Sequence, residues 1–321
     1  REAAQTDKGS KIYQYLYIHP NPQQRMQITF LGTGSMLPTK TRNHSAILIT
    51  HNKYGILFDC GEGTQRQIQH IKTKHNKIDV ICISHWHGDH CLGLPGLIET
   101  LGSLNYSKTL HIYGPTGTKK HLKAMQDSYS SGWNIPIKAF DLENGTIYEN
   151  EEFTIEANKL SHNVESYGFR LIEKDRRRID IEKLTKDKIP QGSHLKDLQE
   201  NKIATYKEKK LDPKTYTYIV QGKIISYISD TGVCLGAQKT AKGADLLISE
   251  STFEESLEVD AKKYNHLTSK QAATIAKSAN AKQLVLTHFS QRYTNTKKLV
   301  SEAKKVFKNT TAAFDLLQIK L

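Results

Sequence analysis

The sequence predicts a mixed α/β (α+β) domain in which two β-sheets pack face to face and helices cover their outer surfaces. Short runs rich in β-branched and aromatic residues recur along the chain, with Gly, Asn or Pro nearby. Between several of these runs, apolar residues recur at intervals of three or four, as in amphipathic helices. The strand-like runs recur too densely for a doubly wound parallel sheet, so two facing sheets fit the pattern better.

The expected elements of the first half begin at Met26, which opens the strand pattern MQITFLGTG. Further strands are expected over residues 46–51, 54–60, 78–85 and 109–114. Helices are expected over residues 63–75 and 91–104.

The second half continues the same alternation of patterns. Strands are expected over residues 153–162, 166–173, 244–251 and 283–288, and a helix over residues 269–280. The segment 215–230, TYTYIVQGKIISYISD, predicts two strands joined by a hairpin turn at Gln221-Gly222.

Two stretches depart from the pattern of a single domain over residues 26–321. Residues 1–25 are polar and without periodicity, which indicates an extension or a remnant ahead of the domain. Residues 171–215 carry 13 Lys and Arg against 9 Asp and Glu, and few periodic apolar residues, although expected strands flank them. This segment is expected to be an insertion, and a mobile loop without a role is the alternative.

The composition restricts the classes of protein to which the chain can belong. No apolar run approaches the roughly 20 residues of a membrane span, and the N-terminal residues lack a secretory signal pattern, so a cytoplasmic protein is expected. The four cysteines are widely spaced, which suits reduced, buried thiols. A net charge of +13 favours a polyanionic partner without establishing one.

The stretch ISHWHGDHCLG follows an apolar run and crowds polar ligands together. His85 and His87 are separated by one residue, so their rings can converge on one side of an extended chain. Asp89 and His90 follow a glycine that permits a tight turn, and they can face a neighbouring point. Imidazole and carboxylate are ligands of borderline divalent metals, so this one stretch can supply ligands to two metal ions.

Further ligands must come from distant strand ends. His162, Asp230 and His288 each terminate an apolar run. Taken singly, each is better explained without a metal, the histidines as ordinary strand-end residues and the aspartate as part of a turn. Together with the histidine-rich stretch, they predict the remainder of two coordination shells.

The stretch SHWHGDH and these three residues resemble the metallo-β-lactamase superfamily. The resemblance implies an αβ/βα four-layer sandwich that binds two Zn²⁺ ions per subunit at one edge. It assigns His85, His87 and His162 to one zinc, Asp89, His90 and His288 to the other, and Asp230 to both. It also implies that Asp59, in LFDCGEGTQ, orients a ligating histidine.

Three further motifs resemble the ribonuclease Z family, whose members trim the 3′ trailer of precursor tRNA. The P-x-K-x-R-N loop of the family is matched by Lys40, Arg42 and Asn43, although a glycine-rich turn with two cations would read the same. Its His-x-Ser-x-Arg-Tyr ending is matched by THFSQRY, with Arg292 and Tyr293 available to a phosphate.

The third motif is the His-Glu-Ala-Thr stretch of the family, with its downstream catalytic histidine. It is matched by LLISESTFEES and YNHLTSKQAA, which supply Glu250 and His266. Ser249 stands where the family usually has His, and the second stretch also reads as a capped helix start.

The resemblance also implies that the insertion is a flexible arm that holds the tRNA elbow. Lys174, Arg176, Arg177 and Arg178 would contact phosphates there, and Ser193 replaces a proline of the arm's Gly-Pro motif. Short members of the family are dimers, so a homodimer is expected.

The expected function is therefore that of a zinc-dependent endoribonuclease. In this reading Asp89 accepts a proton from the attacking water, and His266, held by Glu250, protonates the leaving oxygen. A small-molecule phosphodiesterase or lactonase of the same fold remains an alternative. An RNA-binding protein without catalysis, in which the metal site is only structural, is the third.

Overall fold

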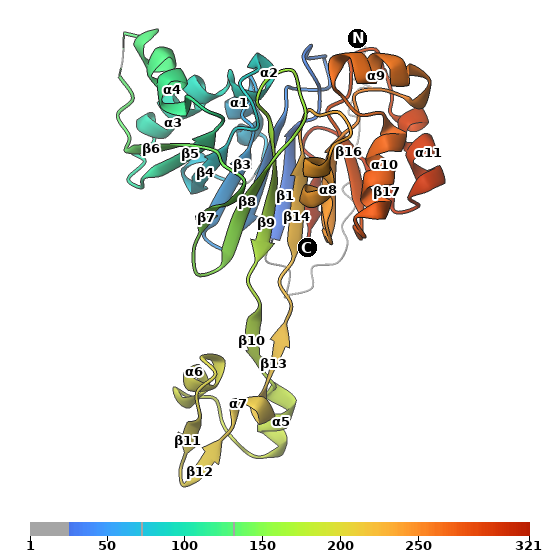
Figure 1. Ribbon diagram of the computed structural model, residues 1–321. Helices are drawn as coiled ribbons and strands as arrows, with labels where there is room; N and C mark the ends of the chain where they lie inside the picture. Colours follow the sequence, from blue (N-terminus) through green and yellow to red (C-terminus); the bar gives the residue numbers. More distant parts are fainter. Residues whose placement is uncertain (1–25, 72, 131) are drawn as a thin grey trace, which may run out of the picture.

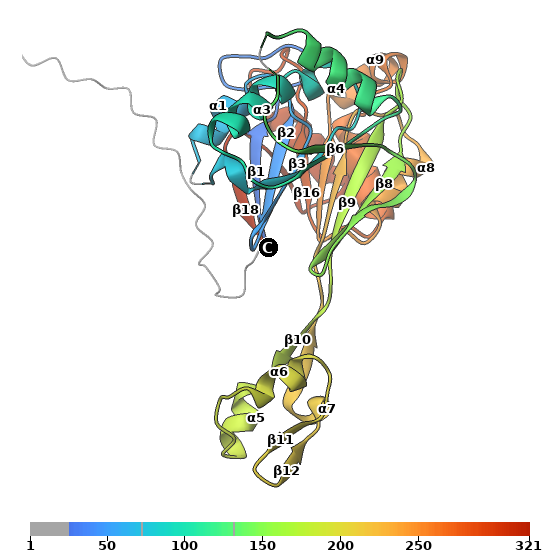
Figure 2. The same ribbon diagram turned by 90° about the vertical axis from the view of Figure 1, so that its left-hand side faces the viewer.

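The computed structural model describes residues 26–71, 73–130 and 132–321. The expected extension, residues 1–25, lies outside the described residues. Two large sheets face each other and helices cover both outer surfaces, which gives four layers (Figures 1 and 2). The predicted fold class is therefore confirmed.

The first sheet is built mainly from the N-terminal half of the chain. In spatial order its strands are β18 (Gln318–Lys320), β1 (Met26–Gly32), β2 (Ala46–His51), β3 (Tyr54–Phe58), β4 (Ile78–Cys82), β5 (Leu110–Gly114) and β6 (Ile137–Asp141). The strands from β3 to β6 run parallel, as their separation by helical segments requires.

The second sheet is built from the C-terminal half. In spatial order its strands are β17 (Thr310–Ala312), β16 (Leu284–Thr287), β15 (Leu246–Glu250), β14 (Ile224–Ile228), β9 (Tyr167–Glu173), β8 (Phe153–Lys159) and β7 (Gly145–Glu149). Strands β14 to β17 run parallel, whereas β7, β8, β9 and β14 pair antiparallel.

Apolar side chains fill the spaces between all four layers. Phe30, Phe58, Phe153, Phe169 and Tyr227 are among the buried residues between the sheets. The helices over the first sheet are α1 (Thr64–Gln69), α2 (Gly88–Cys91), α3 (Leu94–Ser103) and α4 (Thr118–Asp127), with the 3₁₀ turn His75–Lys77. Over the second sheet lie α8 (Leu235–Ala241), α9 (Glu258–Tyr264), α10 (Ser269–Ser278) and α11 (Lys297–Val306), with the 3₁₀ turn Glu255–Leu257.

Residues 174–223 leave the second sheet between β9 and β14 and form an arm that extends away from the sandwich (Figures 1 and 2). Its elements are β10 (Arg176–Ile179), α5 (Ile181–Lys186), α6 (His194–Gln199), β11 (Ala204–Tyr206), β12 (Lys209–Leu211), α7 (Pro213–Tyr216) and β13 (Thr217–Val220). A small apolar core holds the end of the arm together, and it includes Leu184, Ile189, Leu198, Leu211 and Tyr216. The insertion expected over 171–215 thus begins and ends later in the structure, because residues 171–173 still pair in β9.

The expected hairpin turn at Gln221-Gly222 is wrong. Strand β13 pairs with β10, and β14 pairs with β9 and β15, so β13 and β14 never pair with each other. The two residues instead lie where the returning chain passes from the arm into the sandwich. Sequence alone could not separate the cases, because two short β-rich runs around a glycine look the same in both.

Among the described residues, no helix is long and apolar enough to span a membrane.

Candidate metal centre

The predicted ligands meet at one edge of the sandwich, where several strands end. His85 and His87 follow β4, and Asp89 and His90 lie in α2. His162 follows β8, Asp230 follows β14, and His288 follows β16. The structure brings all seven side chains into two neighbouring groups that share Asp230.

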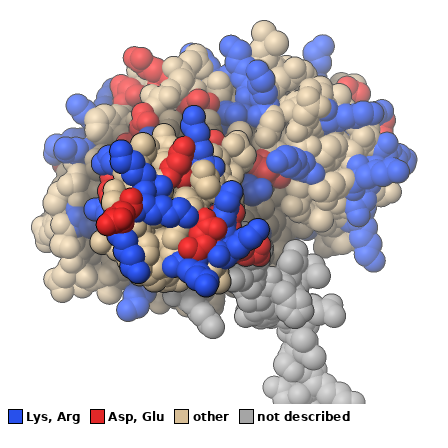
Figure 3. Space-filling model, turned by 90° about the horizontal axis from the view of Figure 1, so that it is seen from below, with Lys and Arg blue, Asp and Glu red and all other residues tan. Residues whose placement is uncertain are grey.

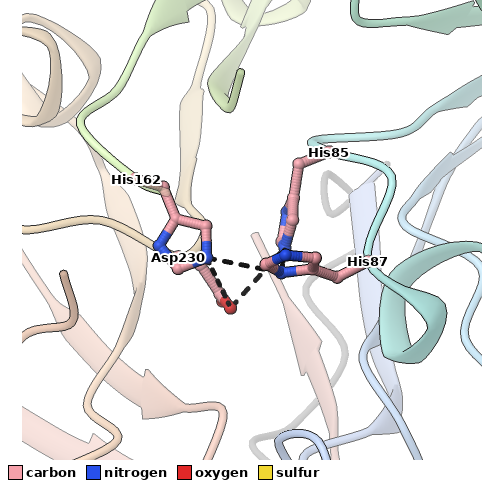
Figure 4. A group of neighbouring side chains, drawn as sticks. All are labelled: His85, His87, His162 and Asp230. Atoms are coloured by element: carbon pink, nitrogen blue, oxygen red, sulfur yellow. Dashed lines mark hydrogen bonds and ion pairs between the residues drawn. The ribbon is translucent and has the colours of Figure 1, made fainter. Parts of the chain in front are cut away.

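The first group contains His85, His87, His162 and Asp230, and their potential ligand atoms all lie within 4.8 Å of one another (Figure 4). His85 Nε2 lies 3.0 Å from His87 Nδ1, and His162 Nε2 lies 3.4 Å from the same atom. The carboxylate Oδ2 of Asp230 lies 3.7 Å from His85 Nε2 and 4.0 Å from His162 Nε2. Three imidazoles and one carboxylate form a donor set that suits a borderline divalent cation.

The second group contains Asp89, His90, His288 and the same aspartate, Asp230. Oδ1 of Asp230 lies 3.5 Å from His90 Nε2 and 3.2 Å from His288 Nε2. Oδ2 of Asp89 lies 3.3 Å and 3.5 Å from the same two nitrogens. One oxygen of Asp230 therefore faces each group, which is the arrangement of a carboxylate that bridges two ions.

Buried polar atoms without partners test whether these residues fit metal ions. Within the described part of the chain, His90 Nε2, His288 Nε2 and Asp230 Oδ1 are buried and form no hydrogen bond. Leaving a buried polar atom unpaired costs about 1–3 kcal/mol. All three atoms face the second group, so a cation there would satisfy them together.

A buried aspartate fixes the orientation of His90. Oδ2 of Asp59 accepts hydrogen bonds from His90 Nδ1 at 2.8 Å and from the Tyr227 hydroxyl at 2.8 Å. The Ser84 amide and hydroxyl donate to the same carboxylate at 2.7 and 3.0 Å. Asp59 adopts a φ of 58°, a left-handed conformation that costs free energy in residues other than glycine. Its predicted place beside a ligating histidine agrees with this geometry.

Three more of the ligand histidines are held in the same way, each with one ring nitrogen bound outside the two groups. The contacts are His85 Nδ1 with Ser84 Oγ at 3.0 Å, His162 Nδ1 with Asn265 O at 3.0 Å, and His288 Nδ1 with Thr252 Oγ1 at 2.9 Å. Sequence reasoning missed Ser84, Thr252, Asn265 and Tyr227. For Ser84 and Thr252 a signal existed, since each is a small polar residue next to or just beyond a buried strand.

The charges of the site favour a cation. Burial opposes ionisation of Asp230, but His288, His90 and His266 outweigh it and hold the pKa of this carboxyl well below its usual range. Burial lowers the pKa of His85 well below its usual value, with His90 adding to the shift, so His85 is neutral. Burial also opposes protonation of His90, yet Asp230, Asp89 and Asp59 raise its pKa. Three carboxylates around one buried imidazole make a site of negative potential.

Beside the two groups lies the predicted pair of Glu250 and His266. Glu250 is fully buried, and its Oε1 lies 3.0 Å from His266 Nδ1. The Thr231 amide and the Thr252 hydroxyl also donate to this carboxylate, at 2.9 and 2.7 Å. Burial lowers the pKa of His266, but Glu250 and Asp230 outweigh it and raise the pKa to about 9. A protonated imidazole therefore stands next to the candidate metal ligands.

The departure at Ser249 leaves this pair intact. Ser249 is a buried residue of β15 whose hydroxyl donates to the Glu250 carbonyl at 3.0 Å.

Three of the residues expected to bind substrate also form hydrogen bonds between loops. Arg42 Nη1 donates to the Tyr293 carbonyl at 2.9 Å, and Asn43 Nδ2 donates to the Glu62 carbonyl at 2.6 Å. The Tyr293 hydroxyl accepts the Glu254 amide at 2.8 Å. Lys40 and Arg292 are exposed.

Sequence reasoning also missed Asp315, which anchors the loop containing Arg42 and Asn43. It accepts the Asn43 amide at 2.7 Å and the Thr33 hydroxyl at 2.7 Å.

The predicted phosphate ligands of the arm lie near its base. Lys174 pairs with Glu149 at 2.6 Å, and Arg176 Nε lies 3.3 Å from Glu173. Arg177 donates to the Thr217 hydroxyl, and Arg178 is half-buried on the same strand. Ser193 precedes α6 further out. Seen from below, basic and acidic side chains intermingle on the arm (Figure 3).

Comparisons with known proteins agree with this architecture over most of the chain. A ribonuclease Z of Bacillus cereus is 38% identical over 300 residues, which are 91% of this chain and 98% of that protein. Ribonuclease Z of Bacillus thuringiensis (strain Al Hakam) matches to the same extent.

Solved structures show the same likeness. The human short-form tRNase Z superposes with a TM-score of 0.67 at 29% identity, over 91% of this chain and 98% of that one. The metallo-β-lactamase fold protein YhfI from Bacillus subtilis superposes with a TM-score of 0.66 at 23% identity, over 93% and 100%, which shows the fold alone.

A family model, described as anti-Pycsar protein Apyc1, matches residues 26–206. This range holds the ligand candidates from His85 to His162 but ends before Asp230, Glu250, His266 and His288, which the ribonuclease Z similarity includes.

Proposed function

This chain belongs to the ribonuclease Z family of metal-dependent endoribonucleases, and we propose that it cuts precursor tRNA immediately after the discriminator nucleotide. The Apyc1 family model also matches part of the chain, residues 26–206. The products would be a tRNA with a 3′-hydroxyl and a trailer with a 5′-phosphate. The observation that carries the proposal is the pair of ligand groups that share Asp230, in a chain similar to ribonuclease Z along nearly its whole length.

We assign two Zn²⁺ ions per subunit to the two groups, because histidine nitrogen with carboxylate oxygen is a ligand set that zinc favours. His85, His87 and His162 would hold one ion, Asp89, His90 and His288 the other, and Asp230 both. Bound there, the ions supply Lewis acidity, which lowers the pKa of a water molecule and stabilises the negative charge of a phosphodiester.

Two groups of the chain would move protons in this reaction. Asp89 is ionised, because His90 and His288 outweigh the effect of its burial on the pKa, so its carboxylate can accept the proton of the attacking water. His266 is protonated at neutral pH, and Glu250 holds its Nδ1, so the other ring nitrogen can give a proton to the departing ribose O3′. Such a general acid is worth about 10²–10⁴-fold in rate.

The arm supplies the contact with tRNA away from the cut. Strand β10 contains three arginines, which can contact the phosphate backbone of tRNA. Because such contacts depend on shape and backbone charge rather than on base sequence, the arm could bind every tRNA. We further propose that the protein is a homodimer in the cytoplasm, in which one subunit's arm holds the tRNA that the other subunit cuts.

The test is incubation of the purified protein with a precursor tRNA that carries a labelled 3′ trailer, followed by mapping of both new ends. One cut after the discriminator nucleotide, abolished by a chelator and restored by zinc, is the expected result. A protein that hydrolyses only small diesters or lactones would leave the precursor intact. A protein that retards the precursor in a gel without cutting it would be a non-catalytic RNA-binding protein.

A further inference from the structure

The joint between arm and sandwich consists of residues 173–175 on the outgoing chain and 221–223 on the returning chain. On the sandwich side, Ile172 of β9 pairs with Ile224 of β14. On the arm side, Arg176 of β10 pairs with Val220 of β13. Three residues on each chain separate these pairs, so both ladders follow one register and nothing is inserted between them.

Carboxylates take the place of backbone acceptors inside the joint. The Glu173 amide still donates to the Lys223 carbonyl at 2.9 Å, as in a ladder. In return, however, the Lys223 amide donates to the Glu173 side chain, Oε2, at 3.0 Å. The Gly222 amide donates to the side chain of Asp175, Oδ1, at 2.9 Å. The ladder is interrupted, yet these amides keep acceptors in one fixed geometry.

Glu173 connects three parts of the molecule. It is only 6% exposed, and Oε1 lies 3.3 Å from Arg176 Nε at the start of the arm. The same oxygen lies 3.9 Å from Nε2 of His51, which is buried at the end of β2 in the opposite sheet. Its other oxygen holds the returning chain at Lys223. A buried carboxylate is stable only while it keeps such partners, so movement of the arm would disrupt its surroundings.

The glycine of the joint is required by space. A Cβ atom at Gly222 would lie 1.8 Å from the Glu173 carbonyl oxygen and 2.5 Å from the carbonyl carbon. Only glycine allows the two chains to approach this closely. The joint is therefore tight at the position where Glu173 and Asp175 hold the backbone.

From this geometry we propose that Glu173 is a positioning residue that locks the direction of the arm and so sets where a tRNA held by the arm presents its 3′ end. The inference rests on the proposed function, in which the arm holds tRNA. A two-stranded linker with an interrupted ladder would otherwise let the arm swing. Holding the reacting atoms in place is worth much of the rate, because a misplacement of about 1 Å can cost roughly 10²-fold.

The test compares Glu173→Gln with two exposed carboxylates of the same region. Gln keeps the shape of Glu173 and removes its charge. Asp175→Ala removes the acceptor of the Gly222 amide at an exposed site, so the sandwich will still fold. Glu149→Ala is the matched control, since Glu149 pairs with Lys174 at the surface and accepts no backbone amide that the structure records.

Arm direction is measured without RNA. Spin labels at Lys196→Cys, on the exposed side of α6, and Lys123→Cys, on α4, give a distance distribution by pulsed electron resonance in protein diluted with unlabelled chains. Glu173→Gln should broaden this distribution markedly and Asp175→Ala less so, while Glu149→Ala leaves it unchanged. An unchanged distribution in both joint variants overturns the lock, whether or not the protein cuts tRNA.

The kinetic readout separates positioning from general damage. Glu173→Gln should lower kcat on precursor tRNA about tenfold, while the Kd for tRNA and the hydrolysis of bis(p-nitrophenyl) phosphate stay near the wild-type values. Equal losses on both substrates would mean a merely structural role and would overturn the proposal. Failure of the unaltered protein to cut precursor tRNA would instead refute the proposed function.

Discussion

The metal centre draws its side chains from separate strand ends, whereas the arm is one continuous stretch between β9 and β14. Most of the candidate ligands are buried and bound by a second polar residue, whereas the arm carries its charges at the surface around a small core. The metal centre holds a few ligand atoms in fixed positions, and the arm presents charged side chains away from the sandwich. If the arm holds the substrate as proposed, chemistry and substrate choice can be altered independently.

The largest expected effect is on the metal centre. Among the seven predicted ligands, Asp230 is the one that belongs to both ligand groups. Asp230→Ala should therefore lower precursor tRNA cleavage and small-diester hydrolysis by several orders of magnitude. Bound zinc, measured by mass spectrometry of the purified protein, should fall with them. Asp127→Ala, at an exposed carboxylate of α4, is the control and should change neither. Normal zinc content in Asp230→Ala would contradict the assignment of this residue.

Removal of the arm should affect one activity alone. Glu173 and Lys223 face each other in the ladder, so an Asn-Gly turn can replace residues 174–222. This variant should retain its zinc and hydrolyse bis(p-nitrophenyl) phosphate, but lose measurable cleavage of precursor tRNA. If both activities disappear while the fold is intact by circular dichroism, the separation of the two regions is wrong.

His266→Gln sharpens the comparison within the metal centre. The kcat on precursor tRNA should fall about 10²–10⁴-fold, because a ribose alkoxide needs a proton to leave. Nitrophenolate leaves readily without one, so bis(p-nitrophenyl) phosphate should be affected far less. Zinc content should remain that of the wild type, and its loss would make His266 a ligand and not a general acid.

The smallest effect concerns a single charge of the arm. Arg178→Gln should weaken precursor binding a few-fold and reduce the slope of log Kd against log salt by about one, the expectation for one lost phosphate contact. Titration at several salt concentrations measures it. Lys123→Gln, on α4 of the sandwich, is the control. An unchanged slope would exclude Arg178 from the RNA contact.

The ligand groups could be predicted because the relevant signal is local in the sequence. The candidates lie a few residues beyond β4, β8, β14 and β16, and these strands end at one edge of the sheets, which brings distant positions together. Asp59 was found through its motif. By contrast, Tyr227 reads as an ordinary core aromatic, and only the fold shows that its hydroxyl reaches Asp59.

Three of the strands that the sequence did not predict lack a clear apolar pattern. Strand β7 has no fully buried residue, and β17 and β18 are each three residues long at sheet edges. Their place depends on neighbours far away in the chain. The loop at Arg42 and Asn43 shows the same limit, since its sequence gives no sign that Arg42 binds the Tyr293 carbonyl or that Asn43 binds the Glu62 carbonyl.

The common register on both sides of the joint allows the arm to change in length by discrete steps. Adding two residues to each leg of β10 and β13 would advance the tip by about 6–7 Å, at roughly 3.3 Å per residue, and would keep the same face of the ribbon outward. Adding one residue per leg would turn that ribbon over. The length of the arm can thus change in steps of two residues per strand, while the layers that hold the metal ligands remain unchanged.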